Sequence, residues 1–316
     1  MELIRGQHNL KPRHRGCVAT IGNFDGVHLG HQCILRRLRE AGARLGLPTL
    51  VMSFEPHPLE VFRPDEAPAR ITPLRDKARA LEAAGVNRFL CLPFRPSISS
   101  MAPQTFIEDL LVRRLGVQFL IVGDDFRFGH RRAGDFTTLQ EATDKYGFEL
   151  ERTPTFELDG ARASSTRVRE ALRRGDLPGA ERLLGHPYEL SGRVIHGDRI
   201  GRQLGFPTAN IRLRRHPPMS GILVADVDIG DGPRPGIASM GNRPTVNGKR
   251  ALLEVYLLDF NGNLYGRHLT VTFRDWLRGQ ERYQSLEALR VQIARDVEYA
   301  RLWYRRNGVL AEARDD

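Results

Sequence analysis

The stretch GNFDGVHLGH, residues 22–31, decides how the first half of this chain folds. It follows an apolar run at residues 17–21 and leads into residues 31–46, where apolar side chains recur at helical spacing with arginines opposite. A glycine-rich turn between a strand and a helix presents backbone N–H groups and a helix N-terminus to an anion. His28 and His31 share one face of that terminus, where they can donate to phosphate oxygens. We therefore predict a phosphate-binding turn.

Two histidines at this spacing have other interpretations. Taken alone, each is a surface residue or a hydrogen-bonded core residue. A zinc site would need a third ligand, and no nearby set of Cys, His or Asp residues supplies one. The combination of strand, glycine turn, two histidines and helix favours phosphate binding over both.

The pattern around this turn predicts an α/β domain. Apolar runs alternate with helical patterns; the runs are at residues 17–21, 49–54, 88–92, 119–122 and 148–152, and the helices at residues 31–46, 73–84, 103–115 and 135–146. Strand, helix and strand repeating at about 30 residues indicate βαβ units. We predict a doubly wound, Rossmann-like parallel sheet, in which ligands bind beyond the carboxyl ends of the strands.

The pattern changes near Gly185-His186-Pro187. Short alternating runs broken by Gly, Pro and Asn follow, and an amphipathic helix at residues 285–306 ends them. This predicts a small antiparallel β-barrel with a terminal helix. A length of 316 residues suits two domains, which we expect at residues 1–186 and 187–316.

The charge of the chain bears on its partners. There are 48 Lys and Arg against 38 Asp and Glu, a net charge of +10. The basic residues are scattered, whereas a nucleic-acid binder would have basic runs interleaved with aromatic residues. We expect no nucleic-acid partner, and a general attraction to anions such as phosphorylated small molecules.

The hydropathy, the first residues and the cysteines indicate where in the cell the protein is expected. No stretch of about 18 apolar residues suggests a transmembrane helix, and residues 1–16 do not resemble a secretory signal. The three cysteines, at positions 17, 33 and 91, form no CxxC pair. We expect a cytoplasmic protein without a membrane partner, present as a monomer or weak homo-oligomer.

Two further segments of the first half carry polar chemistry. SSTRVR, residues 164–169, places hydroxyls and an arginine at a helix start, which suits a second phosphate grip, although a serine there can simply cap the helix. GDDFRFG, residues 123–129, follows a strand and suits a ligand loop, although it can also be a polar turn.

Together these motifs resemble a known family. GNFDGVHLGH is similar to the nucleotidyltransferase signature GxFDGxHxGH, and SSTRVR to its second motif, ISSTxxR, with Ala163 at the packing position usually held by Ile. With FEPHP, residues 54–58, and GDDFRFG, the first half resembles the FMN adenylyltransferase module of bacterial bifunctional riboflavin kinase/FAD synthetases.

The resemblance implies a reaction and residue roles. The FMN phosphate would attack the α-phosphate of ATP, giving FAD and pyrophosphate with no covalent enzyme intermediate. His28 and His31 would stabilise charge on the phosphates. The other implied contacts are Gly22, Phe24 and Asp25 for the nucleotide; Ser164, Ser165, Thr166 and Arg169 for the phosphates; and Asp124, Phe126, Arg127, Phe128 and His57 for the flavin and nucleotide.

The second half carries its own chemistry. GRQLGFPTAN, residues 201–210, combines a glycine loop with Thr208 and Asn210, whose oxygens suit Mg²⁺ held with ATP phosphates, although its composition also suits a hairpin loop. Glu254 is the one carboxylate of the strand at residues 252–258. It is either a solvated surface residue or the base that phosphorylation of a hydroxyl requires.

These segments resemble the riboflavin kinase module of the same family. The matching motifs are GxxxGFPTAN, GNRPT at residues 241–245 and LEVYLLDFNGNLYG at residues 253–266. The resemblance implies that Glu254 is the base for the ribityl 5′-hydroxyl and that Thr208 and Asn210 bind Mg²⁺ and ATP. The loop at residues 197–205, with its ATP-binding glycines Gly201 and Gly205, would close over the nucleotide.

We expect a bifunctional enzyme that converts riboflavin to FMN and FMN to FAD with ATP. Three alternatives remain: a transferase for another phosphate acceptor, a nucleic-acid-binding protein, and a regulatory flavin-binding protein without catalysis. Two positions depart from the kinase pattern, because Ser239 stands where Asn is common and Gln280 replaces a frequent acidic residue.

Overall fold

A computed structural model describes residues 1–198, 200–213, 215–245 and 248–310. The chain divides into two compact units, Met1–Pro68 with Leu74–Ser165, and Ala69–Pro73 with Thr166–Asp316. This spatial division differs from the expected boundary at residues 186 and 187, because the helices after Ser165 pack with the second half. No described helix is long and apolar enough to cross a membrane.

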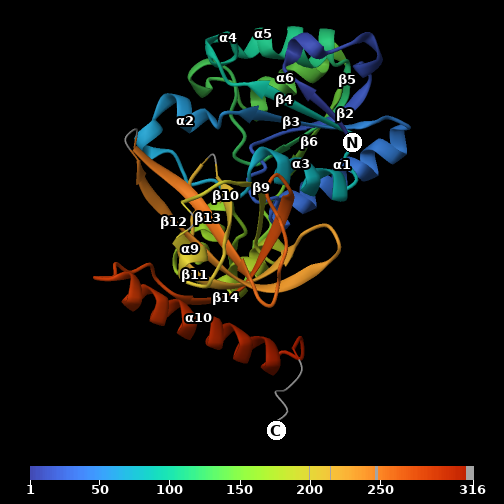
Figure 1. The fold of residues 1–316 in the computed structure, drawn as a ribbon. Helices are drawn as coiled ribbons and strands as arrows, with labels where there is room; N and C mark the ends of the chain where they lie inside the picture. Colours follow the sequence, from blue (N-terminus) through green and yellow to red (C-terminus); the bar gives the residue numbers. More distant parts are fainter. Residues whose placement is uncertain (199, 214, 246–247, 311–316) are drawn as a thin grey trace. The chain divides into compact units, whose positions relative to one another are not determined.

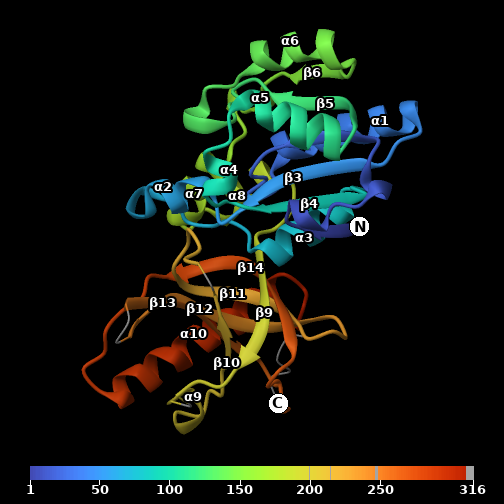
Figure 2. The same ribbon diagram turned by 90° about the horizontal axis from the view of Figure 1, so that it is seen from above.

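The first unit is built on a six-stranded sheet in the order β1-β4-β3-β2-β5-β6 (Figure 1). The strands are β1 (Glu2–Arg5), β2 (Cys17–Ile21), β3 (Thr49–Glu55), β4 (Arg88–Pro93), β5 (Val117–Gly123) and β6 (Glu149–Thr153). All neighbours pair in parallel, which confirms the predicted sheet. In Figure 2 the labelled strands β6, β5, β3 and β4 lie in this order, and β2 lies between β5 and β3. Only β1, a short edge strand beside β4, was not predicted.

Helices cover both faces of this sheet. The helical elements are α1 (Leu29–Leu45), α2 (Pro58–Phe62), α3 (Leu74–Ala83), α4 (Pro96–Ser99), α5 (Pro103–Thr105), the π-helical η4 (Phe106–Arg114) and α6 (Phe136–Tyr146), with 3-10 turns at Gln7–Asn9, Pro12–His14, Pro64–Glu66 and His130–Arg132. One core cluster contains α1 and α3, and the other contains η4 and α6. Consecutive residues of β2, Cys17 and Val18, belong to different clusters. A sheet covered on both faces explains the continuous apolar runs.

The strand order places the motif turn. The chain runs from β2 to β3 and β4 on one side, and then returns to β5 on the other side of β2. The carboxyl ends of β2 and β5 are therefore the switch point where such sheets bind ligands. Residues 22–28 follow β2 directly, and residues 124–128 follow β5. A two-stranded hairpin, β7 (Glu157–Leu158) and β8 (Ala161–Arg162), completes this unit.

The second unit is a closed barrel in the order β10-β13-β12-β11-β14-β9. Its strands are β9 (Glu189–Ile195), β10 (Ala209–Arg212), β11 (Gly221–Asp228), β12 (Pro233–Thr245), β13 (Gly248–Leu257) and β14 (His268–Arg278), and its helices are α7 (Ser165–Arg173), α8 (Leu177–Leu184), α9 (Ile200–Gln203) and α10 (Leu286–Arg306). All strand neighbours pair antiparallel, which confirms the predicted barrel. Strand β10, inside the glycine-rich segment, was not predicted.

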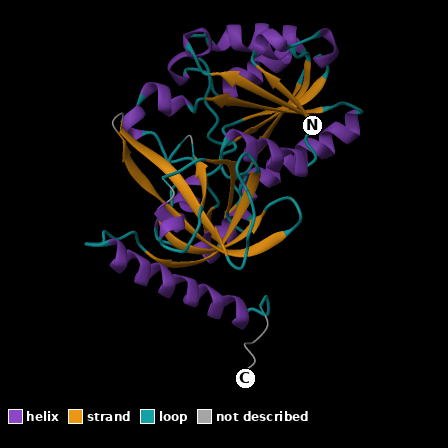
Figure 3. Cartoon of the chain, in the orientation of Figure 1, coloured by secondary structure: helices purple, strands orange, loops and turns teal. Residues whose placement is uncertain are grey.

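Helix α10 packs along the outside of the barrel (Figure 3). Its Ala300 and Tyr304 are fully buried against the barrel residues Val224 and Ile237. The Tyr304 hydroxyl donates to Asp226 Oδ1 at 3.0 Å and accepts from the Gly236 N–H at 3.3 Å. Burial raises the pKa of this phenol, so the hydroxyl remains a donor. These contacts hold the C-terminal half of the helix against the barrel.

Candidate functional site

The turn after β2 holds backbone conformations that side chains rarely adopt. Phe24 has a φ of 48° and Val27 a φ of 40°, both in the left-handed region. Each such residue costs of order 1–3 kcal/mol and persists only where its surroundings hold it. The carbonyl of Asn23 accepts from Lys77 Nζ at 2.6 Å and from Ser53 Oγ at 3.2 Å. The turn is therefore held from both α3 and β3.

The structure brings the two predicted histidines together. Their imidazole rings stack with centroids 3.8 Å apart and an interplanar angle of 27°. His28 is the N-cap residue of α1 and is 6% exposed, while the His31 ring lies 4.8 Å from the ring of Phe24. Both imidazoles therefore stand at the positive end of a 17-residue helix. This arrangement can stabilise negative charge that develops on a phosphate.

Gly30 allows another segment to approach the histidines. A Cβ at this position would lie 3.1 Å from the carbonyl oxygen of Ala163 and 3.1 Å from His28 Cε1. The Ala163 segment leads to Ser164 and Ser165, and Ser165 Oγ donates to the Asp25 carbonyl at 2.9 Å. The structure thus places Ser165 of the second motif beside the first, and phosphate binding by the two serines stays a prediction.

The rest of the second motif belongs to the second unit. Thr166 is exposed in the first turn of α7, and Arg169 lies one turn after Ser165. Arg169 is 7% exposed, and its Nε donates to the carbonyl of Ala69 at 2.7 Å. One edge of this guanidinium therefore has a structural contact that the sequence did not suggest. Phosphate binding by Thr166 and Arg169 stays a prediction.

The loop after β5 is held by its own polar contacts. Asp124 accepts from the Thr155 hydroxyl and lies 3.5 Å from Arg162 Nη2. The Thr155 hydroxyl holds the pKa of the Asp124 carboxyl below its usual range. Arg127 pairs with Asp135. These contacts fix the loop, and its role in ligand binding stays a prediction.

The aromatic residues of this loop and His57 also have structural contacts. The rings of Phe126 and Phe128 stack at 5.5 Å, and Phe128 is buried in a core cluster. His57 is 8% exposed and is the N-cap of α2, where its Nδ1 accepts from the Leu59 N–H at 3.2 Å. The structure therefore gives His57 a capping role that explains its burial. Its predicted ligand contact is untested.

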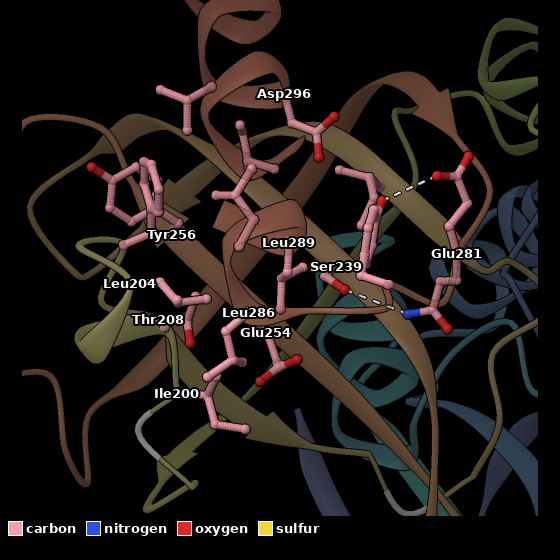
Figure 4. A pocket seen from close by; sticks show the side chains of 18 of the residues that line it. Ile200, Leu204, Thr208, Ser239, Glu254, Tyr256, Glu281, Leu286, Leu289 and Asp296 are labelled. Atoms are coloured by element: carbon pink, nitrogen blue, oxygen red, sulfur yellow. Dashed lines mark hydrogen bonds between the residues drawn. The ribbon is translucent and has the colours of Figure 1, made fainter. Parts of the chain in front are cut away.

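In the second unit a cavity of about 640 Å³ lies on the outer face of the barrel (Figure 4). The segment at residues 200–208, strands β12 and β13, and helix α10 form its walls. Its apolar lining includes Ile200, Leu204, Ile237, Tyr256, Leu289, Ile293 and Val297. Thr208, Ser239 and Glu254 contribute polar groups. The predicted loop glycine Gly201 lines the cavity as well, whereas Gly205 lies in an exposed turn with a φ of 88°.

Strand register explains why Glu254 faces this cavity. Its neighbours in β13, Leu253 and Val255, are fully buried inside the barrel, so alternation turns Glu254 outward. Glu254 is directly opposite Asn210 of β10 and Ser239 of β12. Opposite residues have Cβ atoms about 4.5–5.5 Å apart and point to the same face. A carboxylate, an amide and a hydroxyl therefore form a row across three strands.

Asn210 and the glycines around it fit a small cation. Asn210 Oδ1 is buried and, among the described residues, has no hydrogen-bond partner. Leaving a buried acceptor unsatisfied costs about 1–3 kcal/mol. A Cβ on Gly197 would lie 2.6 Å from this oxygen, and one on Gly201 would lie 2.4 Å from the Phe206 carbonyl. Glycine at position 197 therefore keeps the loop close to the Asn210 amide, and glycine at position 201 keeps it close to the Phe206 carbonyl.

Two features of the cavity escaped the sequence analysis. Arg278 of β14 and Asp296 of α10 form a two-point ion pair, Nε to Oδ1 at 3.0 Å and Nη2 to Oδ2 at 2.6 Å. The hydrogen bonds to Asp296 raise the pKa of the Arg278 guanidinium. No local pattern links residues 18 positions apart. The sequence predicts the apolar face of α10. It does not distinguish the part of this face that lines the cavity from a face that packs in a core.

The two positions that depart from the kinase pattern contact each other. Gln280 Nε2 lies 3.5 Å from Ser239 Oγ at the edge of the cavity (Figure 4). Among the described residues, no group of three His, Cys, Asp or Glu side chains is placed to hold a metal ion. Any metal here would therefore rely on ligands of other kinds, such as Thr208, Asn210 and phosphate oxygens.

Comparisons with known proteins also divide the chain into two parts. The family model for FAD synthetase matches residues 10–167, and that for riboflavin kinase matches residues 184–304. The bifunctional riboflavin kinase/FMN adenylyltransferase of Pseudomonas fluorescens is 54% identical over 95% of this chain and 97% of its own. The protein of the same description from Escherichia coli K12 is 52% identical over 96% and 98%.

A solved structure is similar over the whole length. It is described as a macrolide-efflux protein from Streptococcus pneumoniae, is 29% identical, and covers 96% of this chain and 100% of that one with a TM-score of 0.78. The similarity supports the architecture described above. The two relatives found by sequence are much more similar to this chain than that structure is, and the comparison of function rests on them.

Proposed function

The chain belongs to the family of bifunctional riboflavin kinase/FMN adenylyltransferases, and from this we propose a residue assignment for each of its two reactions. The riboflavin kinase domain phosphorylates riboflavin with ATP to give FMN. The FAD synthetase domain transfers the adenylyl group of a second ATP to FMN, giving FAD and pyrophosphate. We assign the two activities to residues 1–186 and 187–316, with the transferase first in the chain.

We assign adenylyl transfer to the turn that carries His28 and His31. A phosphate oxygen of FMN forms the bond to the α-phosphorus of ATP, and the bond to pyrophosphate breaks. The stacked imidazoles, at the positive end of α1, donate to phosphate oxygens and stabilise the charge of the transition state. Such catalysis is positioning plus electrostatics. The backbone held at Phe24 and Val27 supplies the positioning.

The remaining transferase residues are assigned to binding the nucleotide, the phosphates and the flavin. Gly22, Phe24 and Asp25 line the nucleotide pocket, and Ser164, Ser165, Thr166 and Arg169 hold the β- and γ-phosphates. The loop with Asp124, Phe126, Arg127 and Phe128, together with His57, contacts the flavin and nucleotide. The close approach at Gly30 supports the serine assignment, because it brings the two motifs of the first unit together.

We assign riboflavin phosphorylation to the cavity, with Glu254 as general base. Its carboxylate takes the proton of the ribityl 5′-hydroxyl, whose oxygen forms the bond to the γ-phosphorus of ATP while ADP leaves. Asp296 also lines the cavity, but both of its oxygens accept from Arg278. Asp296 is thereby tied to Arg278, whereas the place of Glu254 in the row with Asn210 and Ser239 favours it as the base.

The cavity suits a flat aromatic substrate. Its volume of about 640 Å³ is within the usual range of ligand pockets, about 300–1,000 Å³. Apolar side chains of α10 and the barrel line most of its wall. We propose that the flavin ring lies against α10, with its ribityl chain directed to Glu254.

We propose that Thr208 and Asn210 hold Mg²⁺ together with the ATP phosphates. Hydroxyl and amide oxygens suit this hard cation, and the buried Oδ1 of Asn210 supports the assignment. When bound, Mg²⁺ would neutralise charge on the ATP phosphates. Gly201 and Gly205 let the loop at residues 197–205 approach the nucleotide.

The row formed by Asn210, Glu254 and Ser239 is the observation that carries the kinase assignment. Its test separates flavins by chromatography after incubation with riboflavin, ATP and Mg²⁺. The unaltered protein should form FMN first and FAD afterwards.

Glu254→Gln should form no FMN from riboflavin yet still convert added FMN to FAD. Glu281→Gln, which changes another carboxylate of the cavity wall, is the matched control and should retain FMN formation. FMN formation by Glu254→Gln at the rate of this control would exclude Glu254 as the base.

We also propose a cytoplasmic location, a monomeric or weakly self-associating state, and no nucleic-acid partner. The three free cysteines, two of them buried, suit a reducing compartment. The dispersed arginines suit small anionic substrates better than a nucleic acid.

A further inference from the structure

The loop between β5 and α6 carries a pair of arginines to which neither reaction has been assigned. Arg131 and Arg132 are exposed, and we call residues 129–133 the arginine turn. Among the described residues, neither of the two guanidinium groups has a hydrogen-bond or ion-pair partner. The arginine turn therefore presents two positive charges that no acidic side chain of the described structure neutralises.

The other arginine pairs of the first unit are at residues 36–37 and 113–114, and they differ in this respect. Their arginines bind acidic side chains: Arg37 pairs with Glu151, and Arg113 and Arg114 both pair with Asp109. An arginine that is paired on the protein surface has little attraction left for a ligand. The arginine turn is thus the arginine pair of this unit whose charge is available to an anion.

The backbone of the arginine turn is strained at both arginines. Arg131 has a φ of 52° and Arg132 a φ of 59°, so two consecutive residues lie in the left-handed region. Glycine and asparagine adopt this region readily, whereas longer side chains rarely do. Residues in such conformations persist only where their surroundings hold them, and they cluster at ligand-binding sites. The strain therefore points to a function of the turn beyond joining β5 to α6.

Backbone hydrogen bonds hold the arginine turn in place. Phe128 and Gly134, on its two sides, each donate an N–H to the carbonyl of the other at 3.0 Å. The N–H of His130 donates to the carbonyl of Met101, just before α5, at 2.8 Å. A segment fixed in this way loses little conformational freedom when it binds a ligand. The two guanidinium groups are therefore carried on a preorganised backbone.

The strand order puts the arginine turn at the edge of the sheet where ligands bind. The turn follows β5, and β5 pairs in parallel with β2, which leads into residues 22–28. The carboxyl ends of neighbouring parallel strands share one edge of a sheet, and ligands of such sheets bind there. Asp135 after the turn is the N-cap of α6, so the positive end of that helix adjoins the turn as well. This part of the edge attracts anions.

We propose that the arginine turn is a phosphate-binding site for the substrates of adenylyl transfer. Arg131 and Arg132 donate to phosphate oxygens of ATP or of FMN at the carboxyl edge of the sheet. A guanidinium offers paired N–H donors that match the oxygens of a phosphate, and such charge-assisted bonds are about twice as strong as neutral ones. The proposal rests on the assignment of adenylyl transfer to the first unit.

Arg131→Asn combined with Arg132→Asn tests the site. Asparagine tolerates the left-handed region, so the variant removes two charges and keeps the backbone. In steady-state adenylylation at low ionic strength, the KM for ATP or for FMN should rise about 10-fold, with kcat within about twofold. The rise should shrink at about 0.5 M salt, because salt screens exposed charges. A rise for ATP assigns the turn to the triphosphate, and a rise for FMN assigns it to the FMN phosphate.

Arg113→Gln combined with Arg114→Gln is the matched control. It changes the net charge by the same amount, but these arginines precede β5 and so lie toward the amino end of the strand that the arginine turn follows. Both KM values for adenylylation should stay within about twofold in this control. The KM for ATP of riboflavin phosphorylation should be normal in both double variants. Unchanged KM values in the asparagine variant, or an equal rise in both double variants, overturn the proposal.

Further variants keep the result decisive. Kinase activity and the circular dichroism spectrum show whether the asparagine variant folds; if it does not, Arg131→Gln and Arg132→Gln decide, and at least one should raise the same KM about threefold. Arg131→Lys combined with Arg132→Lys keeps the charge and should recover most of the affinity. His28→Ala runs alongside: normal adenylylation by His28→Ala refutes the role given to that histidine, whereas unchanged KM values in the arginine variants refute the phosphate site.

Discussion

The turn proposed for adenylyl transfer and the cavity proposed for riboflavin phosphorylation are assembled in opposite ways. The turn takes its histidines from one stretch of ten residues, 22–31, and holds them with strained backbone and a few contacts from α3 and β3. The cavity takes its groups from strands and helices between residues 200 and 297, and alternation and register decide which side chains meet. A site made from one short stretch, such as the turn, is sensitive to changes in backbone geometry. A site whose groups are brought together by strand register, such as the cavity, is sensitive to substitution of single side chains and to the packing of α10.

The substitution with the largest expected effect stops one of the two reactions and leaves the other. His28→Ala combined with His31→Ala should lower adenylyl transfer by about 1,000-fold or more, because loss of one such donor costs about 100- to 1,000-fold. Riboflavin phosphorylation should continue, so FMN accumulates in the flavin chromatogram. The control is His8→Ala, at an exposed histidine of the same unit. Loss of both reactions in a protein that is still folded would contradict the two-site description.

The next effect concerns the cation of the cavity. Asn210→Ala removes the buried oxygen assigned to Mg²⁺, so the Mg²⁺ concentration for half-maximal kinase activity should rise about 10- to 100-fold. Titration with Mg²⁺ at fixed riboflavin and ATP measures this. Removing Mg²⁺ with a chelator should stop the kinase in the unaltered protein. Asn307→Ala, beyond the end of α10, should titrate normally, and an Asn210→Ala curve that matches it would dismiss the assignment.

A smaller effect probes the wall of the cavity. Arg278→Lys keeps the charge but loses the two-point contact with Asp296, so α10 is held less firmly and the KM for riboflavin should rise about fivefold. Arg301→Lys is the matched control, since Arg301 forms a similar two-point pair with Asp259 outside the cavity. Steady-state kinetics should show the rise in Arg278→Lys alone. Equal KM values in both variants would mean that the ion pair does not shape the flavin site.

The smallest effect lies outside both regions. Hydrogen bonds from Tyr146, Gln104 and Lys145 lower the pKa of Glu108 from 4.5 to about 2. A carboxyl whose pKa is lowered by folding stabilises the native state above its unfolded pKa, and this contribution is lost as the pH falls from 4.5 toward 2. Glu108→Gln should therefore be slightly less stable than the unaltered protein at pH 7.

Denaturant unfolding at several pH values measures this difference, which should shrink in acid. Glu157→Gln, at an exposed glutamate of β7, is the control and should show no such trend. Both enzyme activities at pH 7 should be normal in Glu108→Gln, since this carboxylate lies in neither site. A difference in stability that grows in acid would have the wrong sign for the proposed cause.

Much of the fold follows from local pattern. The apolar runs and helical spacing predicted five of the six parallel strands and the major helices, because each element carries its own periodicity. The short strands β1 and β10 were missed, since four residues are too few to show a period. The candidate residues His28, His31, Ser165, Thr208 and Glu254 could be proposed from the sequence because family motifs are contiguous, and their roles stay predictions.

Other features had no local signal. His57 was expected near a ligand, and only the structure reveals that it caps α2. The expected domain boundary followed the change in pattern at residue 187, whereas contacts group α7, α8 and residues 69–73 with the second unit. Packing between distant segments leaves no trace in composition or spacing.

The sequence by itself determined the parallel sheet, the barrel and the order of the family motifs along the chain, because these depend on residues close together in the chain. Only the tertiary structure decided that Asn210, Glu254 and Ser239 share one face, that Arg278 binds Asp296, and that residues 69–73 pack away from their neighbours in sequence. Strand register and the burial of apolar faces set these contacts, and both are properties of the whole fold.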